Sequence, residues 1–304
     1  MDPFSRFSHY FAAVATSGSL RKAAEQLHVS ASAINRQILL AEEMMGAPLF
    51  ERLPAGLKLT TAGEMLYDDI RRWSREFRRT RQRFNELQGL KRGHVSVALI
   101  AALNEGVVVD ALAGVARTYP WLTFDLAVHD SQTVVGLVAS AGVDFGLLLD
   151  PVAHSGLEVR AFCEMPIGVA MPADHPLAQQ PSLSFGQISE NRHIMPTAPL
   201  MVHERTAMLY ARHGMTPQAT ICCNDIRLIT SLVCAGAGLA VLSLLDVRQQ
   251  VASGELAFVP LHGQTVRPLT LALCVAPKRQ LSRAAQVVIQ HLSQVLENLA
   301  EEQG

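Results

Sequence analysis

The stretch Ser19-Leu-Arg-Lys-Ala-Ala-Glu-Gln-Leu-His-Val-Ser-Ala-Ser-Ala-Ile-Asn-Arg-Gln-Ile-Leu-Leu40 decides the fold of the N-terminal third of this 304-residue chain. Its pattern predicts two short helices joined by a tight turn, and Ile34 and Ile38 give the second helix a buried stripe. The opposite face carries side chains of the kind that reach base edges and phosphates in the DNA major groove. They are Ser32, Asn35, Arg36 and Gln37. The stretch therefore predicts a helix-turn-helix.

The flanking sequence extends this motif to a winged helix-turn-helix. Residues 4–16 predict a first helix, and two short extended segments around Pro54-Ala-Gly56 predict a β-hairpin, the wing. We expect DNA contacts from both the second helix of the motif and the wing. The expected DNA-binding residues are Ser30, Ser32, Asn35, Arg36, Gln37, Arg52 and Lys58. For Arg52 the motif leaves a second role open, an ion pair that braces the wing against Glu42 or Glu43.

A long helix is predicted after the wing. Thr61-Ala-Gly-Glu64 has the pattern of a capping box, in which Thr61 accepts from the Glu64 amide. The apolar residues that follow alternate at spacings of four and three, as in a heptad seam interrupted once by Thr80. They are Leu66, Ile70, Trp73, Phe77, Phe84 and Leu87. Because one helix cannot bury such a seam on itself, we expect dimerisation through it; the alternative is packing on the chain's own C-terminal domain.

Beyond a hinge marked by Gly89 and Gly93, apolar strands alternate with helices to the end of the chain. This alternation predicts an α/β domain with a parallel sheet covered on both faces. Two crossovers, near residues 162–167 and 260–269, predict two halves with a cleft between them. The expected domains are 1–60 for the winged helix-turn-helix, 61–92 for the linker helix, and 93–304 for the remainder. Within the last, one half spans 93–162 and 269–304, and the other spans 163–268.

Charge is divided unevenly along the chain. Residues 1–93 hold 15 Lys/Arg against 10 Asp/Glu, whereas residues 94–304 hold 11 against 17. A cationic N-terminal third is typical of a module that binds a polyanion. The sequence has no membrane-length apolar run, and its N-terminus lacks the layout of a signal peptide. We therefore expect a cytoplasmic protein with no membrane partner.

The sequence lacks the common enzyme signatures. It has no P-loop and no Gly-x-Ser-x-Gly elbow, and Ala207 stands where a zinc-protease motif beginning at His203 needs its second histidine. We expect no catalysis, no metal and no cofactor. The five cysteines are odd in number and form no CxxC, which argues against a disulfide framework. The neighbours Cys222 and Cys223 leave two interpretations open, a redox or thiophilic-metal sensor and a strand with one sulfur in the core.

Over its full length the chain resembles LysR-type transcriptional regulators. The residues that carry the resemblance are Ser19–Leu27, Ser30–Ile38, Glu42-Glu43, Leu49–Arg52, Leu59–Gly63 and, more weakly, Leu232–Leu242. The resemblance implies an all-α winged helix-turn-helix with a long dimerising linker helix. It implies a C-terminal effector-binding domain of two Rossmann-like subdomains, shaped like a periplasmic binding protein. It also implies homodimers and homotetramers on double-stranded promoter DNA, RNA polymerase as a further partner, and a small-molecule effector.

Several residues depart from the family pattern. Ala31 and Ser32 stand where Gln and Pro are usual, and Asn35 stands where Ser is usual. Leu39-Leu40 and Ala55 occupy positions that are often basic, so we expect fewer phosphate contacts and a flatter salt dependence of DNA binding. Asn35 is able to donate and accept to adenine, which predicts an altered operator.

Family position also indicates where the effector would bind. The candidates lie after the first strand of the C-terminal domain, at one helix start, and in two loops of the second half. They are Ala101, Ala102, Leu103, Asn104, Ser131, Gln132, Thr133, Thr197, Asn224 and Asp225. Ser131 and Asp225 are equally good candidates for helix caps. Two other functions stay open: a redox-responsive regulator that uses Cys222 and Cys223, and a solute-binding module whose N-terminal part only oligomerises.

Overall fold

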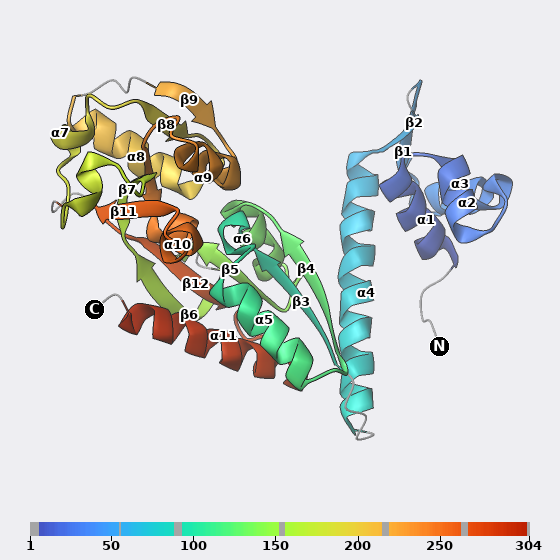
Figure 1. Ribbon diagram of the computed structural model, residues 1–304. Coiled ribbons are helices and arrows are strands. Elements are labelled where there is room, and N and C mark those ends of the chain that lie inside the picture. Colours follow the sequence, from blue (N-terminus) through green and yellow to red (C-terminus); the bar gives the residue numbers. More distant parts are fainter. Residues whose placement is uncertain are drawn as a thin grey trace. The chain divides into compact units, whose positions relative to one another are not determined.

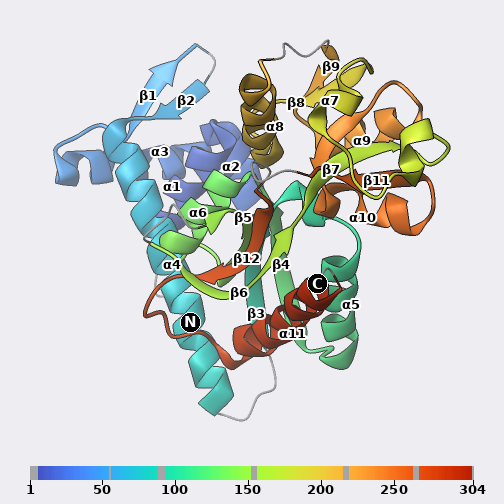
Figure 2. The same ribbon diagram turned by 90° about the vertical axis from the view of Figure 1, so that its left-hand side faces the viewer.

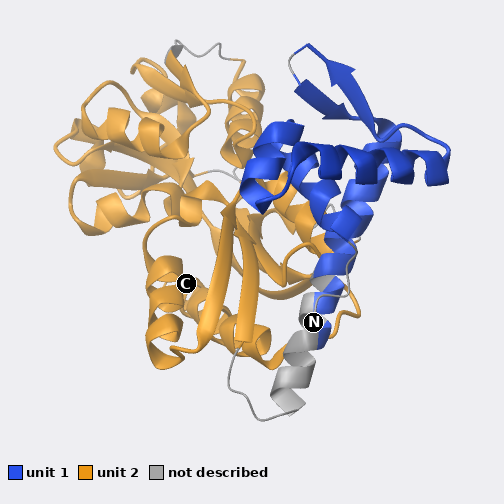
Figure 3. Ribbon diagram, turned by 90° about the vertical axis from the view of Figure 1, so that its right-hand side faces the viewer, with its two compact units in different colours: residues 1–89 blue, residues 90–304 orange. Residues whose placement is uncertain are grey.

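The computed structural model describes residues 6–54, 56–87, 93–151, 156–214, 219–262 and 267–302. The chain divides into two compact units, residues 1–89 and 90–304 (Figure 3). Each unit has its own hydrophobic core. The two units are therefore described separately.

Unit 1 is a three-helix motif followed by a hairpin and a long helix (Figure 1). Its elements are α1 (Arg6–Ser17), α2 (Leu20–Leu27), α3 (Ala31–Met45), β1 (Phe50–Leu53), β2 (Gly56–Leu59) and α4 (Thr61–Leu87). Ser19 and Ser30 cap α2 and α3 by accepting hydrogen bonds from the amides of Lys22 and Ala33. His28 ends α2 in the left-handed conformation, at φ 55°, which makes the turn between the two helices tight. The predicted helix-turn-helix is thus present.

The core of unit 1 forms around Phe11. This ring is fully buried and contacts the rings of Phe7, Phe50 and Tyr67. The hairpin packs closely on the α1–α2 turn, because the Leu57 amide donates a 2.8 Å hydrogen bond to the carbonyl of Gly18. Gly56, at φ 132°, lies so close to this carbonyl that a Cβ atom would approach it to 2.6 Å. This approach fixes the wing next to its turn, where Gly56 pairs with Leu53.

Helix α4 begins differently from the prediction. The capping side chain is that of Thr60, whose Oγ1 accepts a 3.0 Å hydrogen bond from the Gly63 amide and donates one of 2.6 Å to the Pro48 carbonyl. Thr61 is already the first helical residue. The predicted cap on Thr61 is therefore wrong by one residue, because Thr60 also anchors the loop before the wing and is held in place there.

In unit 2, the first sheet has the strand order β4-β3-β5-β12-β6. Its strands are β3 (Gly93–Leu99), β4 (Leu122–Val128), β5 (Phe145–Leu149), β6 (Glu158–Met165) and β12 (Leu269–Val275). Helices α5 (Val107–Thr118) and α11 (Arg283–Glu301) lie side by side and pack on this sheet (Figure 1). Helix α6 (Ser131–Ala139) packs on β5 and β3, and the short helix η1 (Ala101–Leu103) follows β3. We call this part lobe I.

Lobe II contains a three-stranded and a two-stranded sheet, and Figure 2 shows it as a separate part of the same unit. Its strands are β7 (Ile167–Pro172), β8 (His193–Pro196), β9 (Ala219–Cys223), β10 (Ala240–Ser243) and β11 (Leu256–Pro260). Strand β7 pairs antiparallel with β10 and β11, β8 pairs parallel with β9, and a bridge from His193 to Leu239 links the two groups. The helices of this lobe are η3 (Pro176–Gln179), α7 (Phe185–Ile188), α8 (Met201–Arg212), α9 (Ile226–Cys234) and α10 (Leu244–Ala252).

The predicted parallel sheet is present in part of lobe I, and the other pairings of that sheet are antiparallel. Strands β3, β4 and β5 are parallel, but β12 runs antiparallel to both β5 and β6. The reason is topological: β6 leads the chain out of lobe I at Pro166, and β12 brings it back from lobe II in the opposite direction. Strands β6 and β7 are separated only by Pro166, within the first predicted crossover at residues 162–167. Of the two glycines predicted to mark a hinge, Gly89 lies outside the described residues and Gly93 is the first residue of β3.

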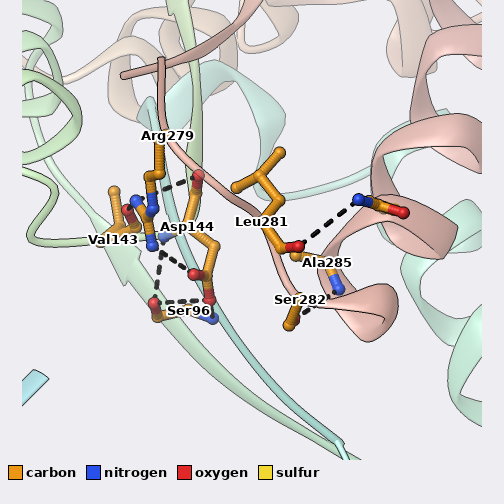
Figure 4. Close-up of polar contacts among 8 residues, drawn as sticks. Ser96, Val143, Asp144, Arg279, Leu281, Ser282 and Ala285 are labelled. Atoms are coloured by element: carbon orange, nitrogen blue, oxygen red, sulfur yellow. Dashed lines mark hydrogen bonds and ion pairs between the residues drawn. The ribbon is translucent and has the colours of Figure 1, made fainter. Parts of the chain in front are cut away.

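A buried ion pair fixes one end of lobe I (Figure 4). The carboxylate of Asp144 accepts hydrogen bonds from the amide and hydroxyl of Ser96, at 2.9 and 3.1 Å. Its other oxygen contacts the Arg279 guanidinium, which also donates to the Val143 carbonyl. The side chains of Asp144 and Arg279 are only 9% and 6% exposed. Both charges are thus buried and mutually dependent.

None of the described helices is long and apolar enough to cross a membrane.

Candidate nucleic-acid interface and ligand cavity

Helix α3 has one buried and one exposed face. Ile34, Ile38 and Ala41 belong to the core of unit 1. Ser32, Arg36 and Leu40 are exposed, and Gln37 is half-buried. The helix therefore presents a polar surface that includes Arg36. A DNA duplex can reach this surface without any rearrangement of the core.

The first turn of α3 is organised by two serines. Ser30 accepts a hydrogen bond of 3.2 Å from the Ala33 amide, and the Ser32 hydroxyl donates to the Ser30 hydroxyl at 3.1 Å. The oxygen of Ser30 is thus used for capping, so its expected phosphate contact has to share that atom. The amide groups of the first turn also form the positive end of the helix dipole, which favours a nearby phosphate.

Arg52 of the wing is bonded to Asn35 of α3. The guanidinium Nη2 donates to Asn35 Oδ1 at 2.9 Å. The expected alternative, an ion pair with Glu42 or Glu43, is not the arrangement found, because Glu42 Oε1 instead accepts the amides of Leu49 and Phe50 at 2.7 and 3.2 Å. The amide hydrogens of Asn35 and the second lone pair of its Oδ1 remain for contacts to DNA. The predicted donor-and-acceptor contact of Asn35 with adenine stays a prediction.

The two wing cations lie on opposite faces of the hairpin. In the β1–β2 register, Lys58 is opposite Glu51, and Arg52 is opposite Leu57. Partners across a ladder share a face, and neighbours along a strand alternate. Arg52 therefore shares the face that meets Asn35, whereas Lys58 lies on the other face beside a carboxylate. Sequence spacing alone did not separate these two roles.

The expected dimer seam on α4 is partly used inside unit 1. Ile70 is 4% exposed and belongs to the core of unit 1, and Leu66 packs against the same core. These two residues thus face their own domain rather than a partner helix, because α1 packs against α4 at this level. Trp73 is 44% exposed. Phe77 is half-buried, and the side chains of Phe84 and Leu87 lie outside the described residues.

Unit 2 contains a cavity of about 270 Å³ at the carboxyl ends of lobe I strands, opposite the start of α8. Such a position is where α/β folds usually bind small molecules. Lobe I contributes the loops after β3 and β4 and the end of β5. Lobe II contributes residues before and within α8, the start of α9, and α10. The lining residues are Ile100, Ala101, Ala102, Val128, His129, Asp130, Ser131, Leu149, Pro199, Leu200, Met201, Val202, Asn224, Ile226 and Asp246.

Four of the expected effector residues line this cavity, namely Ala101, Ala102, Ser131 and Asn224. Of the others, Leu103 is 2% exposed and belongs to the core, so it does not face a ligand. The remaining five are not part of the lining: Asn104, Gln132, Thr133, Thr197 and Asp225. Asp225 caps α9 by accepting the Leu228 amide at 2.8 Å, which is the alternative role given above.

Sequence reasoning missed most of the cavity wall. Pro199, Leu200, Met201 and Val202 carry no polar signal and lie about a hundred residues beyond the lobe I loops. Asp246 was also missed, although Ser243-x-x-Asp246 has the spacing of a capping box that places a carboxylate at a helix start. That spacing is the one signal that would have indicated an acidic residue at this point.

Two cavity carboxylates are held by helix amino ends. Asp130 caps α6, accepting from the amide and hydroxyl of Thr133 at 2.9 and 2.7 Å, and these hydrogen bonds lower its pKa. Asp246 lies in the first turn of α10 and accepts from the Ser243 amide at 3.0 Å. Burial raises the pKa of Asp246 to about 7, with the Ser243 hydrogen bond acting in the opposite direction.

Polar contacts connect the two lobes around the cavity. Arg205 of α8 donates to Asp150, the residue after β5, at 2.5 Å. Asp150 also accepts the Thr270 amide at 2.8 Å. Glu105 of lobe I lies 3.3 Å from Gln250 and 3.7 Å from Arg227 of lobe II. These contacts would break or rearrange if the lobes moved apart.

The cysteines are all free within the part of the chain that the structure describes. Cys222 is exposed, and Cys223 is half-buried and packs against the core of unit 2. The Asp225 amide donates to Cys223 Sγ at 3.4 Å. The strand with one sulfur directed inward, one of the two interpretations of this pair, is thus the arrangement found. Among the same residues, no group of three or more His, Cys, Asp or Glu side chains is placed to hold a metal ion.

Unit 1 presents the exposed polar face of α3 beside a wing that carries an arginine, and unit 2 is a two-lobed α/β domain with a cavity. Together these features define a DNA-binding regulator with a ligand-binding domain. Two family models match the chain: "Bacterial regulatory helix-turn-helix protein, lysR family" at residues 6–64 and "LysR substrate binding domain" at residues 88–297. The chain belongs to the LysR family of transcriptional regulators. It binds DNA through unit 1, and unit 2 is its effector-binding domain.

Individual relatives agree with this assignment. The chain is 26% identical over 253 residues to a RuBisCO operon transcriptional regulator of Allochromatium vinosum, covering 83% of each protein. It is 24% identical over 282 residues to the transcriptional activator CmpR of Synechocystis sp., covering 93% of this chain and 92% of CmpR. Among solved structures, full-length CbnR in complex with its target DNA has a TM-score of 0.70 at 21% identity, over 95% of this chain and 98% of CbnR. A full-length OxyR variant of Pseudomonas aeruginosa has a TM-score of 0.67 at 17% identity, over 98% and 96% of the two chains. These structures share the fold.

Proposed function

We propose that this regulator recognises its promoter through Arg36 and Gln37 of α3, with Arg52 of the wing held beside them by Asn35. The observation that carries the proposal is the Arg52–Asn35 hydrogen bond of 2.9 Å, which places a wing cation at the edge of the exposed face of α3. Arginine is the side chain that most often reads guanine in the major groove. Ser30, Ser32 and Lys58 contribute contacts to the DNA backbone, which position the protein but carry no sequence information.

Two copies are needed to read two half-sites. In this proposal the copies meet along α4 through Trp73 and the apolar residues that follow it, because Leu66 and Ile70 are already covered by unit 1. Pairs of dimers form a homotetramer, which acts in the cytoplasm and contacts RNA polymerase at the promoter. The domains of this assembly are 1–60, 61–92 and 93–304, with the last divided into lobes.

A small molecule in the cavity of unit 2 regulates this assembly. It contacts lobe I at Ala101, Ala102 and Ser131 and lobe II at Asn224 and the start of α8, so its binding depends on how the lobes are arranged. A ligand shifts a conformational equilibrium only by its difference in affinity for the two states. The Arg205–Asp150 contact is part of the lobe arrangement that the ligand would favour or oppose.

The experiment is a footprint of the full-length protein on the DNA upstream of its own gene, at several salt concentrations. We expect protection of two half-sites spaced by a whole number of helical turns, as paired helices require. Equal, salt-insensitive affinity for all sequences would instead favour a solute-binding module whose N-terminal part only oligomerises. A redox-responsive regulator is tested by replacing Cys222 and Cys223 with serine: loss of an oxidant-dependent change in the footprint would favour it.

A further inference from the structure

The described lining of the unit 2 cavity is acidic. Its lining includes the carboxylates of Asp130 and Asp246, and none of its described lining residues is lysine or arginine. His129 is the one described lining side chain that can take up a proton to become a cation. Ten of the remaining positions are apolar. The wall is therefore suited to an apolar body and to groups that donate hydrogen bonds.

The nearby guanidinium groups are already engaged. Arg205 is bonded to Asp150 at 2.5 Å, and Arg227 lies 3.7 Å from Glu105. To bind an acidic ligand, either arginine would have to leave a carboxylate of the same protein. That exchange gives up a charge-assisted contact that the protein already makes, so it offers little net gain.

The chain's own acidic side chains also occupy two of the helix ends that would otherwise attract an anion. Asp130 accepts from Thr133 at the start of α6, and Asp246 accepts from Ser243 at the start of α10. Helix amino ends stabilise negative charge, but here that charge comes from the protein. At the start of α8, Leu200 makes no side-chain cap, so the amides of this helix end are open to a ligand oxygen.

We propose that the effector of this regulator is a small, mainly apolar molecule that carries an amine or another hydrogen-bond donor and no net negative charge. This inference rests on the proposed function of the cavity. The donor group binds Asp246 or Asp130, and the apolar body contacts Ile100, Val128 and Val202. Asp246 is half-buried in the cavity lining, and a donor or cation beside its carboxylate offsets the cost of removing that charge from water.

The experiment compares three probes of one shape but different charge: benzylamine, benzamide and benzoate. Their dissociation constants are measured by isothermal titration calorimetry on the full-length protein at pH 7.5 and low salt. We expect benzylamine to bind at least about tenfold more tightly than benzoate, with benzamide between them. Benzoate binding as tightly as benzylamine, or no measurable binding by both benzylamine and benzamide, would overturn the proposal.

Variants assign the preference to the cavity. Asp246→Asn and Asp130→Asn each keep an oxygen for the capping hydrogen bond and remove a charge. We expect each variant to reduce the benzylamine-to-benzoate affinity ratio by about fivefold or more, whereas Asp110→Asn, on the exposed side of α5, leaves the ratio unchanged. An unchanged ratio in both cavity variants would overturn the proposal. Operator binding is measured on the same samples: loss of DNA binding with an intact probe preference would contradict the proposed function and leave this inference standing.

Discussion

Arg52 of the wing donates a 2.9 Å hydrogen bond to the side-chain oxygen of Asn35 on α3. The bond joins two elements that are 17 residues apart and fixes where the wing cation lies relative to the reading helix. Because a guanidinium only donates hydrogen bonds, it engages the amide oxygen and does not use the amide hydrogens of Asn35. Asn35 therefore supports Arg52 and still has amide hydrogens and one oxygen lone pair for DNA.

This bond predicts that Asn35 and Arg52 are coupled in operator binding. In a double-mutant cycle of Asn35→Ala and Arg52→Ala, the loss of binding free energy should fall short of additivity by about 1 kcal/mol, as for side chains in direct contact. Fluorescence anisotropy with a labelled operator measures the four affinities. The control is Lys58→Ala combined with Asn35→Ala, which should be additive since Lys58 lies on the other face of the hairpin. Additivity in both cycles would contradict the assigned role of Asn35.

The buried pair of Asp144 and Arg279 should be a major source of stability in unit 2. Arg279→Ala leaves the Asp144 carboxylate buried without its counter-charge, and we expect a loss of about 3–5 kcal/mol in the free energy of unfolding. Urea denaturation followed by circular dichroism measures the change. Arg21→Ala is the matched control, because the Arg21–Glu25 pair is exposed and should contribute less than about 1 kcal/mol. Similar losses in the two variants would show that Asp144 is more hydrated than its burial indicates.

The Arg205–Asp150 contact should hold the two lobes together. The two side chains are 27% and 19% exposed, so solvent weakens their attraction, and we expect Arg205→Ala to cost about 1 kcal/mol. Hydrogen exchange by mass spectrometry should then show about fivefold faster exchange at the end of β5 and the start of α8. Peptides from α1–α3 should exchange as in the wild type. Unchanged exchange at both cavity segments would mean that other contacts hold the lobes.

Asp246 should give the protein a specific pH dependence of stability. Its folded-state pKa is about 7, above the ordinary value of 3.8, so between these values the folded protein holds a proton that the unfolded chain releases. The free energy of unfolding should therefore fall as the pH rises from about 4 to 7, with a slope from this group of at most about 1.4 kcal/mol per pH unit. Asp246→Asn should lose this component, whereas Asp110→Asn should keep it. Urea titrations from pH 4.5 to 7.5 test this, and parallel curves for the wild type and Asp246→Asn would contradict it.

Local sequence signals predicted unit 1 well. The tight turn between two short helices and the apolar stripe of Ile34 and Ile38 are short-range features, and the structure confirms both in α2 and α3. The LysR family resemblance and the fold class are confirmed. In unit 1 the sequence could not show that Leu66 and Ile70 would be covered by α1, because both a dimer and a domain core require the same apolar spacing.

The cavity was harder to predict for a different reason. Its walls come from both lobes, and the lobe II wall around Leu200 is apolar, so it looks like any core segment until the fold brings it opposite Ser131. The direction of β12 also depends on the chain's return from lobe II rather than on its own residues. Both features arise from long-range topology, which the spacing of residues along the sequence does not encode.

The most direct test of the account is the affinity of the Arg36→Ala variant for the footprinted operator and for a scrambled duplex of equal length, with the oligomeric state measured in parallel. Arg36 is exposed on the reading face of α3, so its removal should leave the assembly intact. We expect operator affinity to fall by about tenfold to a hundredfold, to near that for the scrambled duplex, as the loss of a base-reading arginine predicts. An intact oligomer of Arg36→Ala that still prefers the operator as strongly as the wild type would contradict the assignment of α3 as the reading helix.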